Sequence, residues 1–319
     1  MKAGIIGAGA VGSATAFSLV MTGVANKVVL TDIKRQKAEA EATDIAHAAP
    51  FASAAKISAG EYADLHGCNV VIITAGANQK PGETRIDLLG RNVKIFEDII
   101  PQVAQNAPES ILLITTNPAD IMTEVALRLS NFPPERVIGS GTVLDTARFR
   151  TLLADYLGVS TKSVHADVLG EHGDSEVLIW SSAEAGTLSL EEYAADVGKT
   201  LDEDKKAEIN DGVVRAAYKI IEGKGATAYG IAGALTQICR AIDNNDHSIL
   251  TVSSHHHEVE GVKNVCLSLP TVICRQGVYH VITPKLSVFE HEKLHQSAVK
   301  MKDHTEKALA MLGAQTPYT

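Results

Sequence analysis

Two short segments of this chain hold side chains that could together move a proton on a small acid. The segment 170–174 (GEHGD) places His172 directly after an apolar run, and the segment 145–148 (DTAR) holds Asp145 and Arg148 three residues apart. On a helix, residues at that spacing share one face. Asp145 could orient the imidazole of His172, and Arg148 could hold a carboxylate with its planar fork. The three residues therefore predict a site that binds a small organic acid and transfers a proton on it.

Other roles for histidine stay open at this level. The chain has 12 histidines, and a lone histidine in a loop is usually solvated or hydrogen-bonded. His255, His256 and His257 are adjacent and invite a metal interpretation. Neighbouring residues on a strand point to opposite faces and cannot converge on one ion, so we expect no metal.

A glycine-rich turn, GAGAVG at 7–12, lies between a short apolar strand and a helix that we expect over 13–22. Gly7 permits the tight turn, Gly9 lets the backbone approach a pyrophosphate, and Gly12 lets helix and strand pack closely. A phosphate would then rest on the positive end of the helix. The motif alone is weak, because a purely structural glycine turn has the same sequence.

An acidic residue at the end of the next strand strengthens this interpretation. The strand expected over 27–32 ends in Asp32, about 20 residues after Gly12. A carboxylate there could accept hydrogen bonds from both ribose hydroxyls of an adenosine, and its charge would repel a 2′-phosphate. We therefore expect NAD rather than NADP as the cofactor. The alternative is that Asp32 is a surface acid.

Three apolar runs in the first half of the chain predict buried strands. They lie at 69–75, 110–116 and 136–141, and helical stretches separate them. Runs that are apolar on both faces are typical of parallel strands covered by helices on both sides. The first half should therefore form a doubly wound parallel sheet of the Rossmann type, which binds ligands beyond the carboxyl ends of its strands.

The pattern changes in the second half. We expect helices over 191–222 and 226–243, then short alternating strands over 249–283, then a last helix. This order predicts an α+β domain. We place the boundary so that residues 1–142 form the cofactor domain and residues 143–319 the substrate domain.

Composition excludes several classes of function. The net charge is −9 over 319 residues and no basic run occurs, so nucleic acid is not an expected partner. The four cysteines show neither CxxC spacing nor disulfide density, which favours a reducing compartment such as the cytoplasm. The segment 3–25 is uncharged and could pass for a signal peptide or a membrane span, but its five glycines disfavour a continuous helix. We expect no membrane association.

The motifs GEHGD, DTAR and GAGAVG, together with NQKPGETR at 78–85, resemble the L-lactate and malate dehydrogenase family in order and spacing over essentially the whole chain. The resemblance implies reversible hydride transfer between NAD and a 2-hydroxy acid, as in the bacterial lactate-type members. His172 would give the proton to the substrate oxygen, Asp145 would raise its proton affinity, and Arg148 would hold the substrate carboxylate. A non-catalytic NAD-binding protein on this fold is the competing class, and it is disfavoured because none of these groups is missing.

The resemblance also gives roles to residues around the pocket. The loop 76–85 would close over the substrate, where Arg85 would stabilise the charge that develops on the reacting oxygen. Asn117 would donate to the substrate oxygen or the nicotinamide, Thr227 would line the pocket, and Asp120 could equally be a helix cap. The implied cofactor contacts are Gly7, Gly9, Val11, Gly12, Asp32, Lys37, Tyr62, Gly76, Ala77, Thr115, Asn117 and Ser140.

Substrate choice depends on Gln79. A malate-type relative carries an arginine at the matching position, where it pairs with the second carboxylate of oxaloacetate. Gln79 is neutral, so a second carboxylate buried beside it would lack a charge partner. The methyl group of pyruvate fits instead, with malate-type or broader 2-hydroxy acid specificity as the alternative. Ala228 stands where many relatives carry a large aromatic, which would admit longer 2-oxo acids if its side chain faces the pocket.

Arg150 and His165 are expected to act outside the pocket. Arg150 lies two residues beyond Arg148 on the same helix, at nearly the opposite azimuth. In bacterial lactate-type relatives the two positions bind fructose bisphosphate across a subunit interface, which would make the protein an allosteric homotetramer. The alternative is that they pair with local acids such as Asp155 or Asp167.

Overall fold

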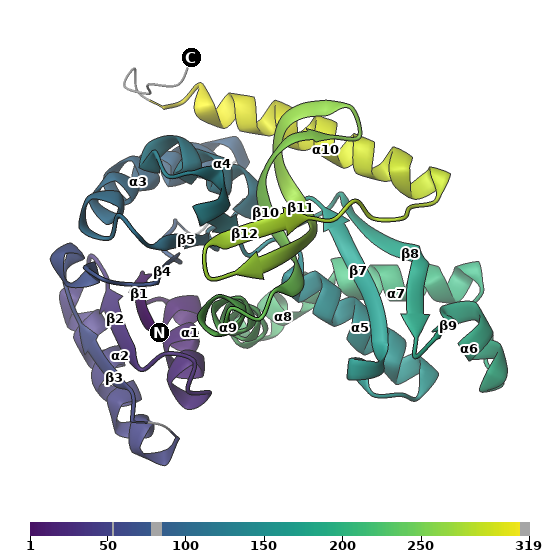
Figure 1. Ribbon diagram of the computed structural model, residues 1–319, viewed down its shortest axis with the longest axis horizontal. Helices are drawn as coiled ribbons and strands as arrows, with labels where there is room; N and C mark the ends of the chain where they lie inside the picture. Colours follow the sequence, from purple (N-terminus) through teal and green to yellow (C-terminus); the bar gives the residue numbers. More distant parts are fainter. Residues whose placement is uncertain (53, 78–84, 313–319) are drawn as a thin grey trace.

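The first half of the chain alternates strands and helices, as its apolar runs predict (Figure 1). The computed structural model describes residues 1–52, 54–77 and 85–312. The strands are β1 (Lys2–Ile6), β2 (Lys27–Thr31), β3 (Lys56–Ala59), β4 (Val70–Ile73), β5 (Ile111–Ile114) and β6 (Val137–Gly139). The helices are α1 (Ala10–Met21), α2 (Arg35–Ala48), α3 (Arg85–Asn106), α4 (Ala119–Ser130) and α5 (Val143–Leu157), with short 3-10 turns η1 (Ala49–Phe51), η2 (Tyr62–Leu65), η3 (Pro134–Arg136) and η4 (Thr161–Ser163).

The six strands of this half form a parallel sheet in the order β3-β2-β1-β4-β5-β6. The direction of winding reverses between β1 and β4. Doubly wound sheets bind their ligands beyond the carboxyl ends of the strands at such a reversal. The predicted Rossmann-type sheet is therefore confirmed, and it places a binding edge next to the glycine-rich turn.

The second half extends the same sheet with antiparallel strands and adds helices (Figure 1). Strand β10 pairs with β6, and the order continues β10-β11-β7-β8-β9, with β12 beside β11. This half contains β7 (Val164–Gly170), β8 (Glu176–Ala185), β9 (Leu188–Ser189), α6 (Leu190–Asp196), α7 (Glu203–Val214), α8 (Ala216–Lys224), α9 (Tyr229–Asn244), β10 (Ser248–Val259), β11 (Val262–Cys274), β12 (Gly277–Val281) and α10 (Val288–Leu309). The predicted α+β second part is confirmed.

Successive residues of the parallel strands other than β3 enter cores on opposite faces of the sheet. Ile5 and Ile72 pack in the core beneath α1, α2 and α9, whereas Ile6 and Ile73 pack in the core beneath α3, α4 and α10. Burying an isoleucine contributes about 1.5–3 kcal/mol, so both layers of helices hold the strands in register. A third core lies between α5, α7 and the β7–β8 hairpin. Helix α5 therefore links the sheet to the hairpin that carries His172.

The prediction of a single helix over 191–222 is wrong, because three helices occupy this range. The first ends before Gly198, whose φ of 70° favours glycine and interrupts the helix. A new helix begins when Asp202 accepts a hydrogen bond of 2.9 Å from the backbone N–H of Lys205. The caps therefore outweigh the continuous helical pattern of the sequence.

Two further expectations differ from the structure in extent. The first helix begins at Ala10 rather than Ser13, so Gly12 lies inside α1 and not in the preceding turn. The strands expected to be short between 249 and 283 include β10 and β11, with 12 and 13 residues. They are long because they form a hairpin whose paired residues run from 248 to 273.

Two expectations from composition concern the state of the cysteines and the presence of membrane-spanning helices. Cys68, Cys239, Cys266 and Cys274 are free and buried, and burial raises the pKa of Cys239 to about 12. Within the ranges that the structure describes, we find no helix with the length and apolar character needed to cross a membrane.

Candidate active site

A cavity of about 490 Å³ lies beside the carboxyl edge of the parallel sheet. Its wall combines side chains from α3, α4, α5, α8 and α10 with residues of the connection between β7 and β8. Asn117, Asp145, Arg148 and His172 all line it. The structure therefore brings the proposed proton donor, its carboxylate partner and the proposed anion-binding arginine into one cavity.

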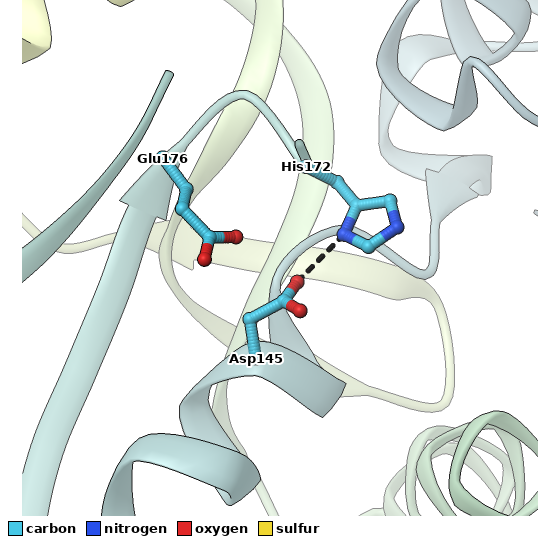
Figure 2. A group of neighbouring side chains, drawn as sticks. All are labelled: Asp145, His172 and Glu176. Atoms are coloured by element: carbon cyan, nitrogen blue, oxygen red, sulfur yellow. Dashed lines mark hydrogen bonds and ion pairs between the residues drawn. The ribbon is translucent and has the colours of Figure 1, made fainter. Parts of the chain in front are cut away.

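The imidazole of His172 is hydrogen-bonded to Asp145 (Figure 2). The distance from Nδ1 to Oδ2 of Asp145 is 2.6 Å, and the other ring nitrogen points away from the carboxylate. Burial alone would lower the pKa of His172, but the charge and the hydrogen bond of Asp145 outweigh it and raise the pKa to about 9. At neutral pH the ring is therefore protonated and can offer a proton from Nε2.

Arg148 binds the same carboxylate from the next turn of α5. Its Nη1 donates to Oδ1 of Asp145 at 2.7 Å. Burial would raise the pKa of Asp145, but His172 and Arg148 together hold it below its usual value. A guanidinium has five N–H donors, so most of the fork of Arg148 can still receive a substrate carboxylate.

Threonines at the start of α5 fix Asp145 relative to the strand that leads to His172. The hydroxyl of Thr142 donates to the carbonyl oxygen of Val168 in β7, and the hydroxyl of Thr146 accepts a hydrogen bond of 2.9 Å from the N–H of Val168. Asp145 lies in the first turn of α5, where the helix dipole favours a negative charge. The Asp145–His172 distance is thus set by buried contacts between α5 and β7.

Asp120 holds the backbone of the His172 loop. Its Oδ2 accepts a hydrogen bond of 2.8 Å from the N–H of His172. Its side chain is only 2% exposed, and burial raises its pKa to about 6 although the Ser253 hydroxyl opposes this. The residue before α4 is Pro118, so Asp120 anchors the loop rather than serving as the N-cap of the helix.

The C-terminal helix anchors the same loop from the other side. Lys300 forms an ion pair of 2.6 Å with Glu171, and the hydroxyl of Ser297 accepts a hydrogen bond of 2.9 Å from the N–H of Glu171. Gly170 and Gly173 take φ values of 85° and 147°, which side chains rarely allow. The GEHGD segment therefore owes its shape to its two glycines and to the contacts that Asp120 and helix α10 make with it.

A second carboxyl group, on Glu176, lies beside the His172–Asp145 pair (Figure 2). One atom from each of Asp145, His172 and Glu176 fits within 4.8 Å of the others, a spacing compatible with metal ligands. Two of these groups are already joined by the 2.6 Å hydrogen bond. Burial, followed by the charge of Asp145, raises the pKa of Glu176 to about 8.

The expected lid is only partly within the described residues. Gln79 lies outside them, and Arg85 is the first residue of α3 but its side chain is outside them too. The start of the loop is joined to Asn117 through Asn92, a residue that no sequence motif marks. Asn92 accepts a hydrogen bond of 2.8 Å from the N–H of Ala77 and donates one of 2.8 Å to the carbonyl oxygen of Asn117.

Thr227 and Ala228 are not brought to this cavity. Both lie just before α9, and neither is among the described residues that line the cavity. The side chain of Ala228 is 7% exposed. The expectation that Ala228 admits longer 2-oxo acids depends on its facing the pocket, and it stays a prediction.

The expected cofactor contacts gather along the carboxyl edge of the parallel sheet. Each follows the end of one of the six strands, apart from Lys37, which lies in the first turn of α2. They are Gly7, Gly9, Val11 and Gly12 after β1, Asp32 after β2, Tyr62 after β3, Gly76 and Ala77 after β4, Thr115 and Asn117 after β5, and Ser140 after β6. Parallel strands thus bring residues far apart in the sequence to one edge.

The glycine-rich turn has the shape that a pyrophosphate needs. A Cβ atom on Gly7 would lie 2.8 Å from the backbone nitrogen of Ala75, and one on Gly12 would lie 1.9 Å from the carbonyl oxygen of Gly7. A Cβ atom on Gly9 would meet nothing within 4 Å. Two glycines therefore allow close packing, while Gly9 borders open space at the start of α1, where backbone N–H groups favour an anion.

Asp32 follows β2 and faces this turn. Its Oδ2 accepts a hydrogen bond of 2.7 Å from the N–H of Ala8, and its Oδ1 accepts one of 2.8 Å from the N–H of Lys34. The carboxylate is thereby fixed beside the glycine-rich turn. The Asp32 carboxylate, which can accept hydrogen bonds from ribose hydroxyls, and the open space at Gly9 together fit a dinucleotide whose ribose hydroxyls are free.

Arg150 pairs with a local acid, as the alternative interpretation anticipates. Its Nη2 lies 2.8 Å from Oδ1 of Asp167, and its Nε donates to the carbonyl oxygen of Ala166 at 2.7 Å. His165 is exposed on β7. Arg150 is on α5 but does not line the cavity that contains Arg148.

The three adjacent histidines of β10 have separate environments. His255 bonds to Glu124 at 2.7 Å, and His256 is buried against the carbonyl oxygen of Leu267 at 3.0 Å. Burial lowers the pKa of His256 to about 4. In the described ranges these histidines do not form a group of ligands around one point.

Comparison with known proteins agrees with this geometry. Residues 1–139 match the model of the lactate/malate dehydrogenase NAD binding domain, and residues 142–312 match that of the lactate/malate dehydrogenase alpha/beta C-terminal domain. The chain belongs to the lactate/malate dehydrogenase family. NAD is therefore its cofactor, and its first domain is the NAD-binding one.

Individual members of the family are close in sequence and structure. The chain is 54% identical to the L-lactate dehydrogenase of Thermus aquaticus, over 95% of this chain and 97% of that protein. It is 52% identical to that of Allorhizobium ampelinum, over 95% and 98% of the two chains. The solved structure of the minor L-lactate dehydrogenase from Enterococcus mundtii, in a ligand-bound form, superposes with a TM-score of 0.92 at 37% identity, over 96% and 97%.

Three side chains of this site were not given their roles from the sequence. Asn92 carried no motif, and its contacts join segments separated by 15 and 25 residues. Asp120 is near a recognised strand end, but its partner His172 is 52 residues away. Glu176 has the clearest signal, because it is an acid four residues after the proposed catalytic histidine.

Proposed function

We propose that this protein catalyses the reversible reduction of pyruvate to L-lactate with NADH. The observation that carries the proposal is the 2.6 Å bond between His172 and Asp145 in a cavity that also holds Arg148. The resemblance to L-lactate dehydrogenases over nearly the full chain supports it. Malate dehydrogenase activity, or a broader L-2-hydroxy acid specificity, is the alternative.

The residues of the cavity divide the work of the reaction. When bound, the cofactor would supply a hydride as NADH and accept one as NAD⁺ in the reverse direction. Arg148 binds the substrate carboxylate through parallel hydrogen bonds and thereby orients the carbonyl group. His172, protonated at neutral pH, gives its Nε2 proton to the carbonyl oxygen and takes it back in the reverse direction. Asp145 fixes the tautomer of His172 and stabilises the imidazolium.

Loop residues complete the proposed site. Asn117 lines the cavity, where it can donate to the substrate oxygen or to the nicotinamide amide. Arg85 would stabilise the developing negative charge on the oxygen when the loop closes, and closure would exclude water. Thr227 keeps its proposed place near the substrate only if the segment before α9 moves toward the cavity.

Rates with two substrates test the proposal. We expect NADH oxidation with pyruvate to have a higher kcat/KM than with oxaloacetate, because Gln79 offers no charge to a second carboxylate. Replacing Gln79→Arg should raise the oxaloacetate-to-pyruvate ratio about 100-fold or more. Steady-state assays of both proteins decide it. A wild type that prefers oxaloacetate contradicts the proposed substrate, and an unchanged ratio shows that Gln79 does not face it.

The boundary and assembly of the protein are proposals as well. A boundary between residues 142 and 143 agrees with the start of α5 at Val143. We propose a cytoplasmic homotetramer.

Activation by fructose bisphosphate is proposed through Arg150 and His165. Phosphate groups between subunits would have to draw Arg150 away from Asp167, which it binds at 2.8 Å. The pyruvate KM should then fall when fructose bisphosphate is titrated at pH 6 to 7. A flat response in the wild type, compared with Arg150→Gln, would assign both residues a structural role.

A further inference from the structure

The side chain of Glu176 has no role in the reaction described above, although it lies in the cavity. It begins β8, four residues after His172, and its carboxyl group is directed toward the His172–Asp145 pair (Figure 2). Its Oε1 atom is buried, and within the part of the chain that the structure describes it has no hydrogen-bond partner. A buried carboxylate oxygen without a partner is costly when the group is ionised, so this side chain requires an explanation.

The inner wall of the cavity is electrically balanced only if Glu176 is neutral. From α5 it presents Asp145 and Arg148, and from the loop it presents His172, which is protonated at neutral pH. A substrate that brings one carboxylate to Arg148 makes two negative charges against two positive charges. An ionised Glu176 would add a third negative charge within a few ångströms of the pair.

The charged groups on the other sides of the cavity are already engaged. Glu171 from the loop pairs with Lys300 of α10 at 2.6 Å. Lys307 of α10 pairs with Asp303 at 2.6 Å, and His304 lies 4.0 Å from the same carboxylate.

Two acids and a phenol complete the surroundings. The hydroxyl of Tyr218 on α8 donates to Asp174 at 3.1 Å, and Asp120 beneath the loop accepts from the N–H of His172. None of these groups provides Glu176 with a described hydrogen bond or ion pair.

We propose that Glu176 is a specificity-determining residue that admits the anionic substrate as a neutral carboxylic acid and weakens its binding when it ionises. The proposal rests on the function proposed above. Substrate binding would then require two protons on the free enzyme, one on His172 and one on Glu176. The raised pKa of Glu176, caused chiefly by burial and then by Asp145, agrees with a neutral group at pH 7.

Linkage between protons and ligand gives a direct test. We would titrate the enzyme–NADH complex with oxamate, an anionic analogue of pyruvate, from pH 6.5 to pH 10. The slope of log Kd against pH equals the number of protons taken up on binding. In the wild type this number should exceed about one above about pH 8.5 and approach about two near pH 10, because both groups are then deprotonated in the free protein.

The variant Glu176→Gln should never take up more than about one proton, since only His172 remains. Between pH 7 and pH 9.5 the wild type should therefore lose about 30-fold more affinity than the variant. Glu109→Gln, a change at an exposed turn, should behave as the wild type. Glu176→Ala sets the same limit of one proton if Glu176→Gln accumulates poorly.

The outcomes separate this inference from the function on which it rests. Uptake of one proton or fewer by the wild type at every pH, or of more than one by Glu176→Gln, overturns the role of Glu176. If the wild type reduces pyruvate at pH 7 in the same preparation, the proposed function stands regardless. Failure of the wild type to reduce pyruvate would instead contradict the proposed function.

Discussion

Two histidines of this protein make nearly the same hydrogen bond, and only one of them lines a cavity with the groups of an active site. His172 bonds to Asp145 at 2.6 Å, and His255 bonds to Glu124 at 2.7 Å. Both carboxylates are 2% exposed. Each also pairs with an arginine one turn further along its helix. Neither the hydrogen bond nor burial therefore distinguishes a catalytic histidine from a structural one.

The two pairs differ in the hydrogen-bond donors that the arginine and the imidazole ring still have free for a ligand. Arg128 places both Nε and Nη2 2.9 Å from one oxygen of Glu124, whereas Arg148 uses only Nη1 on Asp145. His172 and Arg148 share the 490 Å³ cavity with Asn117, but His255 is not among its described lining residues. A histidine–carboxylate pair becomes a catalytic pair when free donors converge on space that a substrate can fill.

Exchanging each histidine for glutamine should give the largest contrast. His172→Gln should lower turnover of pyruvate by about 100- to 10,000-fold while leaving NADH binding nearly intact, because the proton donor is lost and the NAD edge is untouched. His255→Gln should keep turnover within about threefold of the wild type and lower only the melting temperature. Steady-state assays and NADH fluorescence titration would measure both. Retention of a tenth of the wild-type turnover by His172→Gln would remove His172 from its role.

The two arginines should differ in the same direction by a smaller factor. Lysine keeps the charge but cannot bind a carboxylate through two parallel bonds. Arg148→Lys should therefore raise the pyruvate KM about 10- to 100-fold, whereas Arg128→Lys should leave it unchanged. Equal effects of the two substitutions on KM would show that the fork of Arg148 does not hold the substrate.

Much of this arrangement could be predicted from sequence, because short-range patterns determine it. The buried strands appear as apolar runs, and the turn and Asp32 are separated by a recognisable spacing. Parallel strands then bring their carboxyl ends to one edge, whatever the length of the connections. The same logic placed Asn117 correctly beside the cavity.

Contacts between distant segments could not be predicted in this way. Glu124 is 131 residues from His255, and no periodicity relates them. The prediction of one helix over 191–222 failed because the apolar pattern continues through Gly198, whereas the helical backbone is interrupted there by a positive φ. Glu176 had a visible position in the sequence, but its importance depends on burial beside Asp145, which only the three-dimensional structure gives.

The smallest effect concerns the dependence of stability on pH, and it compares His172 with His256 of β10. The pKa of His172 is raised to about 9, so its stabilising contribution is complete below pH 6.5 and is lost as pH rises through 9. The pKa of His256 is lowered to about 4, so its contribution is complete above pH 6.5 and is lost as pH falls toward 4.

Denaturant unfolding of the variants would reveal these opposite signs. The loss of unfolding free energy in His172→Gln should be about 1–2 kcal/mol larger at pH 6 than at pH 9.5. In His256→Gln the loss should instead be larger at pH 7 than at pH 4.5. The same sign in both variants would contradict the assigned environments.

A crystal structure of the protein with NADH and oxamate tests the central claim most directly. We expect the oxamate carboxylate to be bound by the guanidinium of Arg148, and its amide oxygen to lie about 3 Å from Nε2 of His172. Asp145 should remain bonded to Nδ1 of the same ring. A complex in which the anion occupies another site, or in which the ring of His172 has left Asp145 and turned away from the ligand, would contradict the proposed catalytic arrangement.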